Sequence, residues 1–346
     1  MLVEEHVSLK PYNTLRVESR CRYFVQLQSL ADVSEFIAEV RFSRMPRLIL
    51  GGGSNVLLFG NFDGVVARVA LRGMETVRTD EAAVFLRAAA GEDWHGFVMH
   101  SIDQGHAGLE NLSLIPGTVG GAPIQNIGAY GVELSDVLNS VDTLHAATGE
   151  ARTFDRQECQ FHYRDSVFKR DASTQYIITA VTVRLPHTPR YITGYRGVQQ
   201  KLRDNGVSEP DARSISEAVC QLRRAKLPDP GTLGNAGSFF KNPLLPAARL
   251  AALREQYAQL PAHRQASGDY KIPAAWLLER CGWKGRRRGD AGFSDRHALV
   301  LVNHGHASGE ELYDLAQQAR QDVEARFGIE LDIEPQIVRP TSHTHD

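Results

Sequence analysis

The segment Arg47-Leu48-Ile49-Leu50-Gly51-Gly52-Gly53-Ser54-Asn55 sets the first expectation for the fold, because a short apolar run stops at three glycines. An apolar run bounded by a turn signal predicts a buried strand that enters a loop. Glycines let backbone N–H groups approach a ligand closely, and successive amides form a concavity suited to phosphate, to which Ser54 and Asn55 add donors. The segment is neither a Gly-x-Gly-x-x-Gly nor a Walker sequence, so a plain strand-to-turn glycine cluster is its structural alternative.

A second glycine-rich segment covers residues 115–131 and carries no charged side chain. Such a backbone predicts a wrap around a flat, bulky ligand with polar edges. A dinucleotide has both a pyrophosphate and a ring system, so each glycine segment could serve one part of it. A long irregular loop is the alternative, although loops of this length without function are uncommon. The candidate binding residues here are Pro116, Gly117, Gly120, Gly121, Gln125, Asn126, Gly128 and Ala129.

A third segment, Asn235-Ala-Gly-Ser-Phe-Phe-Lys-Asn-Pro243, places Ser238 between a glycine and two aromatic residues. We expect Ser238 on a tight turn against an apolar wall, largely shielded from water. Lys241 and Asn242 supply donors within a few residues of its hydroxyl. One hydroxyl, several donors and little water suit the transfer of a proton to a developing anion. The alternative is a turn with a buried aromatic pair and a capping serine.

Two further segments carry candidate cations. In Phe161-His-Tyr-Arg-Asp-Ser-Val-Phe-Lys169, Arg164 stands among aromatic residues and could clamp a carboxylate with its planar fork. An Arg–Asp surface pair is the alternative. The sequence Arg223-Arg-Ala-Lys-Leu-Pro228 is a basic helix end, whose cations could equally complement the helix dipole.

Strand-like and helix-like patterns alternate without a regular βαβ rhythm, which predicts an α+β fold instead of a doubly wound one. Asp32 is the expected N-cap of the first helix. We expect residues 341–346 to form a disordered tail. The expected strands are 47–50, 65–69, 84–88, 137–144, 176–185 and 331–334, and the expected helices are 32–42, 94–102, 214–226, 273–281 and 308–327.

The composition is that of an ordinary globular protein, with 346 residues, 42% apolar and 23% charged, enough for about two or three domains. The formal net charge of -2 gives no global basic field for nucleic acid. The 4 cysteines are widely spaced, which argues against a disulfide framework and suits a reducing compartment. The 13 histidines fall into no ligand pattern, so no metal is expected. Without a signal-like or membrane-spanning run, we expect a cytoplasmic protein.

Taken together, these segments resemble the UDP-N-acetylenolpyruvoylglucosamine reductase family, over nearly the whole chain and in the family's order. The residues that carry the resemblance are 51–55, 115–131, 163–169, Lys226 with Pro228, 234–243 and Ile333-Glu334-Pro335. The segment around Tyr195 is similar to the subgroup with an extra tyrosine-bearing substrate loop. Gln336 stands where many relatives carry an acid, and the run Arg286-Arg287-Arg288 matches nothing recognisably functional.

The resemblance implies an FAD-binding fold of the vanillyl-alcohol-oxidase (PCMH) type in two subdomains, followed by a smaller α+β substrate-binding domain. The corresponding segments would be 1–70 for the first FAD subdomain, 71–213 for the second (completed by 328–340), and 214–327 for the substrate domain. It also implies a UDP-N-acetylmuramate dehydrogenase of peptidoglycan synthesis, with noncovalent FAD and NADPH. Its substrate would be UDP-N-acetylglucosamine enolpyruvate, and we expect a monomer.

Residue roles follow from the same resemblance. Ser238 is similar in position to the proton donor, while Arg164 and Glu334 are similar to the residues that polarise the substrate carboxylate and stabilise the enolate. The residues that match contacts to the UDP part and the substrate are Tyr195, Lys226 and Asn242, and Arg223 falls among the FAD-binding positions.

Two other readings remain open from sequence. An oxidase of the same fold would use O2 and often a covalent histidine link, but neither glycine segment contains a histidine. A non-catalytic nucleotide-sugar or flavin-binding protein would leave Ser238, Arg164 and Glu334 without a task. Bleaching of a yellow protein by NADPH, and its behaviour in air, would separate these readings.

Overall fold

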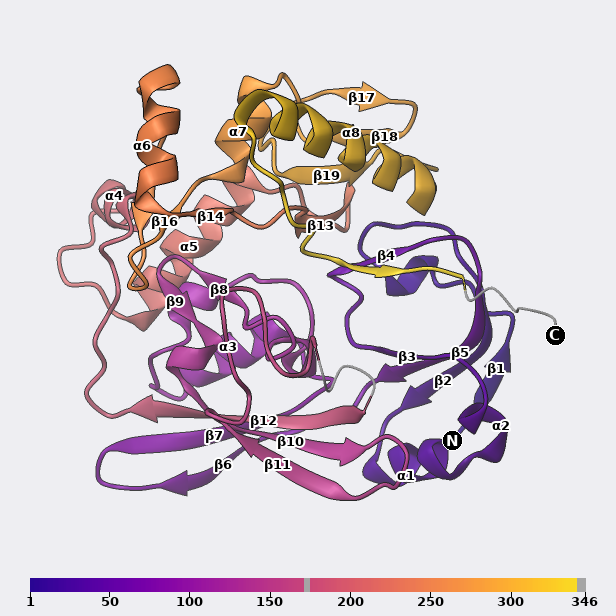
Figure 1. Cartoon of the computed structure of the whole chain (residues 1–346). Helices are drawn as coiled ribbons and strands as arrows, with labels where there is room; N and C mark the ends of the chain where they lie inside the picture. Colours follow the sequence, from indigo (N-terminus) through magenta and orange to yellow (C-terminus); the bar gives the residue numbers. More distant parts are fainter. Residues whose placement is uncertain (171–174, 341–346) are drawn as a thin grey trace.

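The computed structural model describes residues 1–170 and 175–340, so the predicted tail lies outside the described residues. The predicted strand at 47–50 is confirmed as β3, which lies at one edge of the first sheet (Figure 1). In this sheet β5 pairs in parallel with both β2 and β3, and β1 pairs antiparallel with β2. The sheet order is β1 (Val3–Glu5), β2 (Cys21–Leu27), β5 (Phe62–Val69), β3 (Arg47–Leu50).

The first predicted helix differs from the structure in both its start and its length. Residues 32–42 contain most of α1 (Leu30–Ala38) and most of the short α2 (Val40–Ser43), separated at Glu39. Ser29 is the N-cap, and Asp32 lies at the third helical position, where its side chain closes a capping box. The expectation that Asp32 is the N-cap is therefore wrong, because serine and an acidic residue three positions later satisfy two orphan N–H groups together.

The second sheet is entirely antiparallel and contains the predicted strands at 84–88, 137–144 and 176–185. Its long central strand β12 lies between β10 and β7, and seven consecutive residues of β12 are buried. Such a strand, covered on both faces, reads as a continuous apolar run. The sheet order is β11 (Ala151–Asp155), β10 (Leu138–His145), β12 (Tyr176–Pro186), β7 (Ala83–Ala89), β6 (Met74–Thr79).

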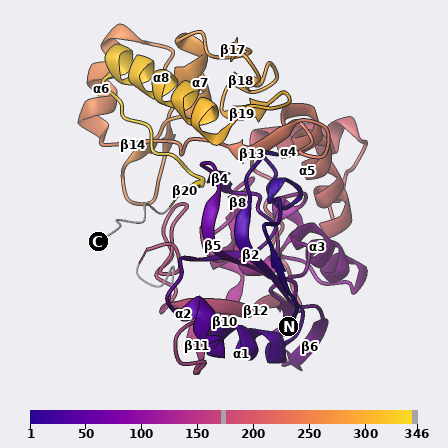
Figure 2. The same ribbon diagram turned by 90° about the vertical axis from the view of Figure 1, so that its right-hand side faces the viewer.

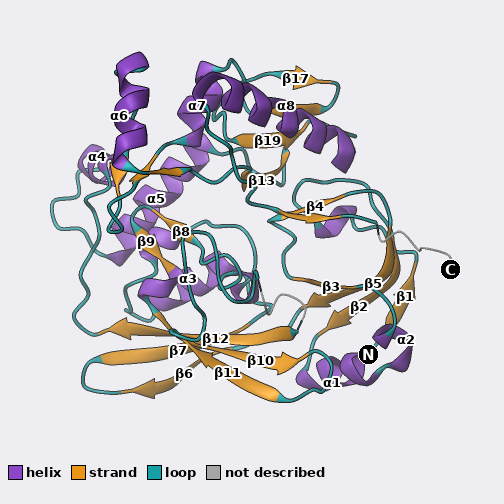
Figure 3. Ribbon diagram, viewed as in Figure 1, coloured by secondary structure: helices purple, strands orange, loops and turns teal. Residues whose placement is uncertain are grey.

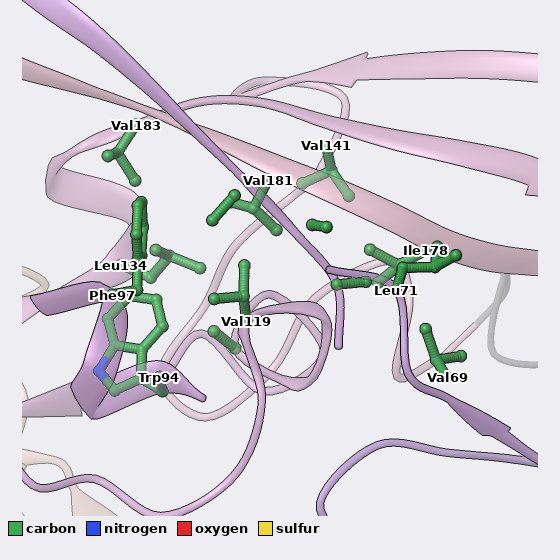
Figure 4. Close-up of a cluster of buried hydrophobic side chains, with 14 of the residues drawn as sticks. Val69, Leu71, Trp94, Phe97, Val119, Leu134, Val141, Ile178, Val181 and Val183 are labelled. Carbon is green, nitrogen blue, oxygen red and sulfur yellow. The ribbon is translucent and has the colours of Figure 1, made fainter. Parts of the chain in front are cut away.

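The glycine-rich segment 115–131 is fixed to the second sheet by its apolar side chains. Figure 4 shows Val119 pointing into the cluster formed by Val141, Val181 and Trp94. Val119 is fully buried, and Trp94 donates its indole N–H to the carbonyl of Leu112 at 2.9 Å. The short elements over this face are α3 (Trp94–Asp103), η2 (Glu110–Leu112), η3 (Val119–Gly121), β8 (Gly128–Ala129), β9 (Val132–Glu133) and η4 (Leu134–Asp136). The predicted helix at 94–102 is thus confirmed as α3.

Two helices connect the second sheet to the C-terminal part. The predicted helix at 214–226 is confirmed as α5 (Ala212–Lys226), and it packs against α4 (Arg196–Asp204), which the sequence analysis did not predict. Their shared apolar cluster contains Val198, Leu202 and Val219.

The C-terminal part packs helices on a third sheet, which is antiparallel (Figure 3). The helices predicted at 273–281 and 308–327 are confirmed as α7 (Ala274–Arg280) and α8 (Gly309–Phe327), whereas α6 (Ala247–Gln256) was not predicted. The sheet order is β13 (Gly234–Ser238), β19 (Val300–Asn303), β18 (Ala291–Phe293), β17 (Arg287–Arg288). A small three-stranded sheet beside it has the order β14 (Leu244–Leu245), β16 (Tyr270–Lys271), β15 (His263–Arg264).

The end of the chain returns to the N-terminal part. The strand predicted at 331–334 is wrong, because the pairing strand is β20 (Gln336–Val338) and only Ile333 forms an isolated bridge, with Phe240. β20 pairs in parallel with β4 (Val56–Leu58), beside which it runs in Figure 2. Val338 shares an apolar cluster with Leu58, so residues 336–338 lie against segment 1–70 and not against the strands of 71–213.

None of the helices in the ranges 1–170 and 175–340 is both long and apolar enough to cross a membrane.

Candidate active site

The two glycine segments lie face to face at the end of β3. A Cβ added to Gly51 would lie 2.5 Å from Thr118 Oγ1, and one added to Gly52 would lie 3.0 Å from Gly117 Cα. Ser54 donates its hydroxyl to the carbonyl of Pro116 at 3.1 Å. Residues 51–55 contain no helix or strand, whereas the second segment contains the short η3 and β8, the latter labelled in Figure 3.

A buried polar atom between the two segments lacks a partner. Within the part of the chain that the structure describes, Thr118 Oγ1 is buried and makes no hydrogen bond. A buried hydroxyl without a partner is costly in a folded protein, and a bound ligand is one way to satisfy it. Together with glycines whose missing Cβ atoms let the two segments approach closely, this hydroxyl fits a bound phosphate-bearing cofactor.

Some of the other predicted cofactor residues are glycines because the loops pack closely against their neighbours. Gly53 has φ +62°, and a Cβ there would lie 1.9 Å from the carbonyl oxygen of Tyr12. A Cβ on Gly120 would lie 2.6 Å from Ala90 Cβ, whereas one on Gly121 would meet only Thr118 Oγ1 at 3.8 Å. Gly53 and Gly120 are therefore required by close packing, whatever the ligand.

The polar residues after these glycines form a network that crosses to the catalytic candidates. Asn55 Nδ2 donates to Gln125 Oε1 and, at 3.4 Å, to the backbone carbonyl of Glu334. Asn126 is buried and donates to Glu133 Oε2 at 2.8 Å. The amide of Asn126 thus supports the loop, while Asn55 links the glycine segment to Glu334.

Arg164 is paired with Glu334 and with the second glycine segment. Its Nε is 3.2 Å from Glu334 Oε1, and its Nη2 donates to the carbonyl of Gly128 at 2.6 Å. The backbone of Arg164 has φ +55°, which is uncommon for a residue other than glycine. The alternative of a surface pair with the neighbouring Asp165 does not hold, because Asp165 pairs with Arg170 instead.

Glu334 is a buried acid surrounded by cations. Burial raises the pKa of Glu334, and the charges of Arg164, Lys169 and Lys241 oppose this shift. Lys169 Nζ donates to the backbone carbonyl of Glu334 at 3.1 Å, and burial lowers the pKa of Lys169. The site therefore combines a carboxyl that resists ionisation with cations that favour it, which is a common signature of functional sites.

Ser238 directly precedes Phe239, the residue whose carbonyl binds the backbone N–H of Glu334. It is the last residue of β13, which has a register irregularity between Asn235 and Ser238. Gly237 has φ +69°, and Glu334 donates its backbone N–H to the carbonyl of Phe239 at 2.9 Å. The expected tight turn is thus an irregular strand end, but the expected apolar wall is present, since Phe239 and Phe240 are buried.

The predicted substrate residues lie on three different elements. Tyr195 precedes α4 and is 51% exposed, with its ring 5.3 Å from that of Tyr130 in a T-shaped arrangement. Lys226 ends α5 and is exposed. Asn242 accepts the backbone N–H of Ala274 at 2.9 Å, so it supports the start of α7 as well as facing Tyr163.

Arg223 lies on α5 and is half-buried, and this burial lowers the pKa of its guanidinium. Its Nε donates to the carbonyl of Leu114 at 3.1 Å, directly before the second glycine segment.

Three charged side chains near Arg164 were missed. Burial raises the pKa of Glu133 and lowers that of Lys271, and each group counters the other's shift. Lys271 Nζ lies 4.9 Å from the ring centre of Tyr163. Lys169, the third, belongs to the quoted segment 161–169, but nothing local distinguishes it from a surface lysine. Lys271 comes from β16, more than 100 positions away in the sequence from Tyr163, and only the fold joins them.

Comparisons with known proteins agree with this geometry. Residues 21–155 match the family described as FAD binding domain, and residues 229–338 match the family described as UDP-N-acetylenolpyruvoylglucosamine reductase, C-terminal domain. Reductases of that name from Chromobacterium violaceum and Pseudomonas fluorescens Pf0-1 are 50% and 48% identical to this chain, each over 96% of it and 98% of the relative. The crystal structure of the UDP-N-acetylenolpyruvylglucosamine reductase from Thermus caldophilus has a TM-score of 0.67, 23% identity, and covers 98% of this chain and 99% of that one.

The fold and the two family matches thus define an FAD-dependent oxidoreductase of the vanillyl-alcohol-oxidase type with an additional C-terminal domain. The chain belongs to the UDP-N-acetylenolpyruvoylglucosamine reductase family, whose flavin-dependent reduction is a step of peptidoglycan synthesis.

Proposed function

We propose that this chain is a UDP-N-acetylmuramate dehydrogenase, which uses NADPH to reduce the enolpyruvyl ether of UDP-N-acetylglucosamine to the lactyl ether of UDP-N-acetylmuramate. The observation that carries the proposal is the junction at Glu334. Its side chain pairs with Arg164 at 3.2 Å, and its backbone N–H is bound at 2.9 Å to Phe239, the residue after Ser238. A cation and an acid from distant segments therefore meet, and the backbone beside Glu334 is bound to the residue that follows Ser238.

FAD would be held by residues 51–55 and by the second glycine segment from Pro116 to Ala129, with Thr118 Oγ1 as a donor that is free to bind it. Arg223 would act on the same loop through the carbonyl of Leu114, at 3.1 Å. When bound, FAD supplies the transfer of hydride from NADPH to the vinyl carbon of the substrate.

Arg164 and Glu334 would act on the substrate carboxylate and on the charge that develops next to it. The planar guanidinium of Arg164 suits a carboxylate better than an ammonium would. Glu334 beside a developing enolate is favourable only if it holds a proton, and burial raises its pKa in that direction. A protonated Glu334 would donate a hydrogen bond where charge accumulates.

Ser238 would donate the proton that completes the reduction. A serine hydroxyl is a weak acid, so this role requires a strongly basic acceptor and a cation that stabilises the resulting alkoxide. Lys241 is three residues away, and its charge is felt by the neighbouring Glu334.

Tyr195, Lys226 and Asn242 would bind the UDP part of the substrate. Tyr195 is exposed and can cover a ligand, while Lys226 offers an exposed ammonium to a diphosphate. The three-part division at residues 70, 213 and 327, the monomeric state and the cytoplasmic location remain predictions.

The test is a single-turnover experiment with purified protein that contains FAD. NADPH should bleach the flavin without oxygen, and UDP-N-acetylglucosamine enolpyruvate should then restore its absorbance with formation of UDP-N-acetylmuramate. A flavin that recolours rapidly in air but not with this substrate would identify an oxidase instead.

A further inference from the structure

Asn111 joins two loops that sequence reasoning treats separately. It belongs to η2 and is 1% exposed. Its Nδ2 donates to the carbonyl of Tyr130 at 2.9 Å and to the carbonyl of Ile192 at 2.8 Å. One amide group therefore connects the end of the second glycine segment to the start of the segment that carries Tyr195.

The Tyr130 side of this connection is conformationally demanding. Tyr130 has φ +50° and Gly131 has φ +89°, so two successive residues lie in the left-handed region. For a bulky residue such as tyrosine this backbone is unfavourable and persists only where the surroundings impose it. A hydrogen bond from Asn111 to the Tyr130 carbonyl is one such restraint.

The Tyr195 side is held at both ends. Ile192 lies three residues before Tyr195, and α4 begins immediately after it, with Val198 N–H bound to the Tyr195 carbonyl at 2.9 Å. Val198 is fully buried against α5. Tyr195 itself is exposed, so it stands on a short span between the Asn111 anchor and the helix anchor.

The side-chain oxygen of Asn111 indicates the role of this residue. Asn111 Oδ1 is buried, and in the described ranges 1–170 and 175–340 it has no hydrogen-bond partner. An unsatisfied buried acceptor lowers the stability of the fold. An apolar residue of the same shape would avoid this cost, although it would also lose the two donated hydrogen bonds. The asparagine is thus poorly explained by stability alone and well explained by the two carbonyls that it fixes.

We propose that Asn111 is a positioning residue for substrate binding, which sets Tyr195 relative to Tyr130 by binding the backbone on both sides. The two rings meet at 5.3 Å only while both loops keep this relation. The inference rests on the proposed substrate role of Tyr195. It follows that Asn111 acts on the substrate through Tyr195 and has no effect on the reaction of NADPH with the flavin.

The test is a double-mutant cycle on the FAD-loaded enzyme. Asn111→Leu removes both donated bonds at nearly constant volume, and it should raise the KM for UDP-N-acetylglucosamine enolpyruvate about tenfold, with kcat within about twofold. Flavin bleaching by NADPH should keep its wild-type rate. In a Tyr195→Ala background the same substitution should add no further rise in KM, because the residue that it positions is gone.

Hydrogen exchange of the free enzyme supplies a second measurement. Asn111→Leu should speed exchange within residues 128–133 and 191–197. Thr143→Val is the matched control, because it removes another buried bond, from Thr143 Oγ1 to the Arg152 carbonyl at 2.8 Å, in the second sheet. It should affect exchange near its own strands and leave KM unchanged. If Asn111→Leu does not fold, Asn111→Ser weakens the same two bonds and takes its place.

Each outcome separates the inference from the function on which it rests. A Tyr195→Ala variant with wild-type KM would overturn the substrate role of Tyr195, and the exchange of 191–197 would still test the anchor. Unchanged KM and exchange in Asn111→Leu, with Tyr195→Ala impaired, would overturn the positioning role alone. If the effects of Asn111→Leu and Tyr195→Ala on the free energy derived from KM were fully additive, the positioning role would also be overturned.

Discussion

The glycine segments and the charged cluster at Glu334 lie next to each other but are built from different parts of the chain. Residues 51–55 and 116–121 offer backbone, and their decisive property is the absence of Cβ atoms, as at Gly51 opposite Thr118. The cluster around Glu334 offers side chains, with Arg164 from one part of the molecule and Lys241 from another. Two side chains connect the regions directly: Asn55 binds the carbonyl of Glu334, and Arg164 binds the carbonyl of Gly128 in the second glycine segment.

This difference implies that the two regions fail in different ways. A backbone surface tolerates changes of chemistry but not of volume, because packed interiors respond to a single added methylene. A side-chain cluster tolerates little change of chemistry, because each group has a charge or a proton to hold. Substitutions in the glycine segments should therefore affect FAD binding, and substitutions in the cluster should affect the substrate half-reaction with FAD retained.

The largest effect is expected at Ser238. Ser238→Ala should bind FAD and bleach with NADPH at a near-normal rate, and then stall when the enolpyruvyl substrate is added. General acid catalysis contributes about 10²–10⁴-fold, and we expect a loss of about 10⁴-fold because no second acid is evident in this segment. Stopped-flow flavin absorbance measures both halves.

Ser238→Cys is the accompanying variant and should recover part of the rate, since a thiol is the stronger acid. Reoxidation of Ser238→Ala at wild-type speed would remove the proton-donor role and leave a partly buried strand-end serine.

The next effect concerns Glu334 and pH. Glu334→Gln keeps the shape but cannot exchange a proton, so we expect kcat to fall about 10²-fold with FAD still bound. Full activity of this variant would show that the proton on Glu334 has no role. Arg164→Lys, which keeps the charge but loses the planar fork, should be impaired in the same half-reaction.

Stability gives an independent check on the same carboxyl. Burial raises the pKa of Glu334 in the folded state above its ordinary value of 4.5, which applies to the unfolded chain. Between the unfolded-state pKa and the folded-state pKa, the folded protein therefore binds more protons than the unfolded chain. The wild-type contribution is therefore most favourable below pH 4.5 and is lost as pH rises through the folded pKa. Urea unfolding across pH should show the stability of Glu334→Gln rising relative to wild type in that window, and a constant difference would contradict the shift.

The third effect tests the glycine segments. A Cβ on Gly52 would lie 3.0 Å from Gly117 Cα, so Gly52→Val should separate the two segments and weaken FAD binding. Overpacking costs about 1–3 kcal/mol, which corresponds to a loss of affinity of about 5–150-fold. Gly96→Val is the control, because a Cβ there meets Asp93 Oδ2 at an ordinary 3.5 Å. A Gly52→Val protein that purifies with tightly bound FAD would remove this loop from the cofactor site.

The same contrast explains what the sequence could predict. The glycines are adjacent along the chain, so the sequence alone points to a backbone surface there. The strand at 47–50 and the helix at 94–102 follow from local apolar patterns, and the structure confirms both elements. Segments with weak patterns gave errors. At 331–334 the alternation predicted a strand, but the hydrogen-bonding partner, β4, lies opposite 336–338. Pairing depends on the partner strand, which no local pattern contains.

The charged cluster depends on contacts between distant segments. Arg164 stood out locally as a possible carboxylate clamp, but Glu334 could be named only by resemblance to a family, and their 3.2 Å separation joins residues 170 positions apart. Lys169 and Lys271 were missed for the same reason, since neither carries a local signal. The shifted pKa of Lys271 arises from burial and from Glu133, which are properties of the folded chain.

The smallest effect is expected at Tyr195, and it shows how far the substrate site extends beyond the charged cluster. Tyr195→Phe keeps the ring that meets Tyr130 at 5.3 Å and removes only an exposed hydroxyl. A single hydrogen bond is worth about 0.5–1.5 kcal/mol, so the KM for the UDP substrate should rise about two- to tenfold, with NADPH oxidation unchanged. Tyr195→Ala, which also removes the ring, should raise KM further. If Tyr195→Phe matches wild type while Tyr195→Ala does not, the ring covers the site and the hydroxyl binds nothing. If both match wild type, substrate binding is confined to the side chains around Arg164 and Lys226.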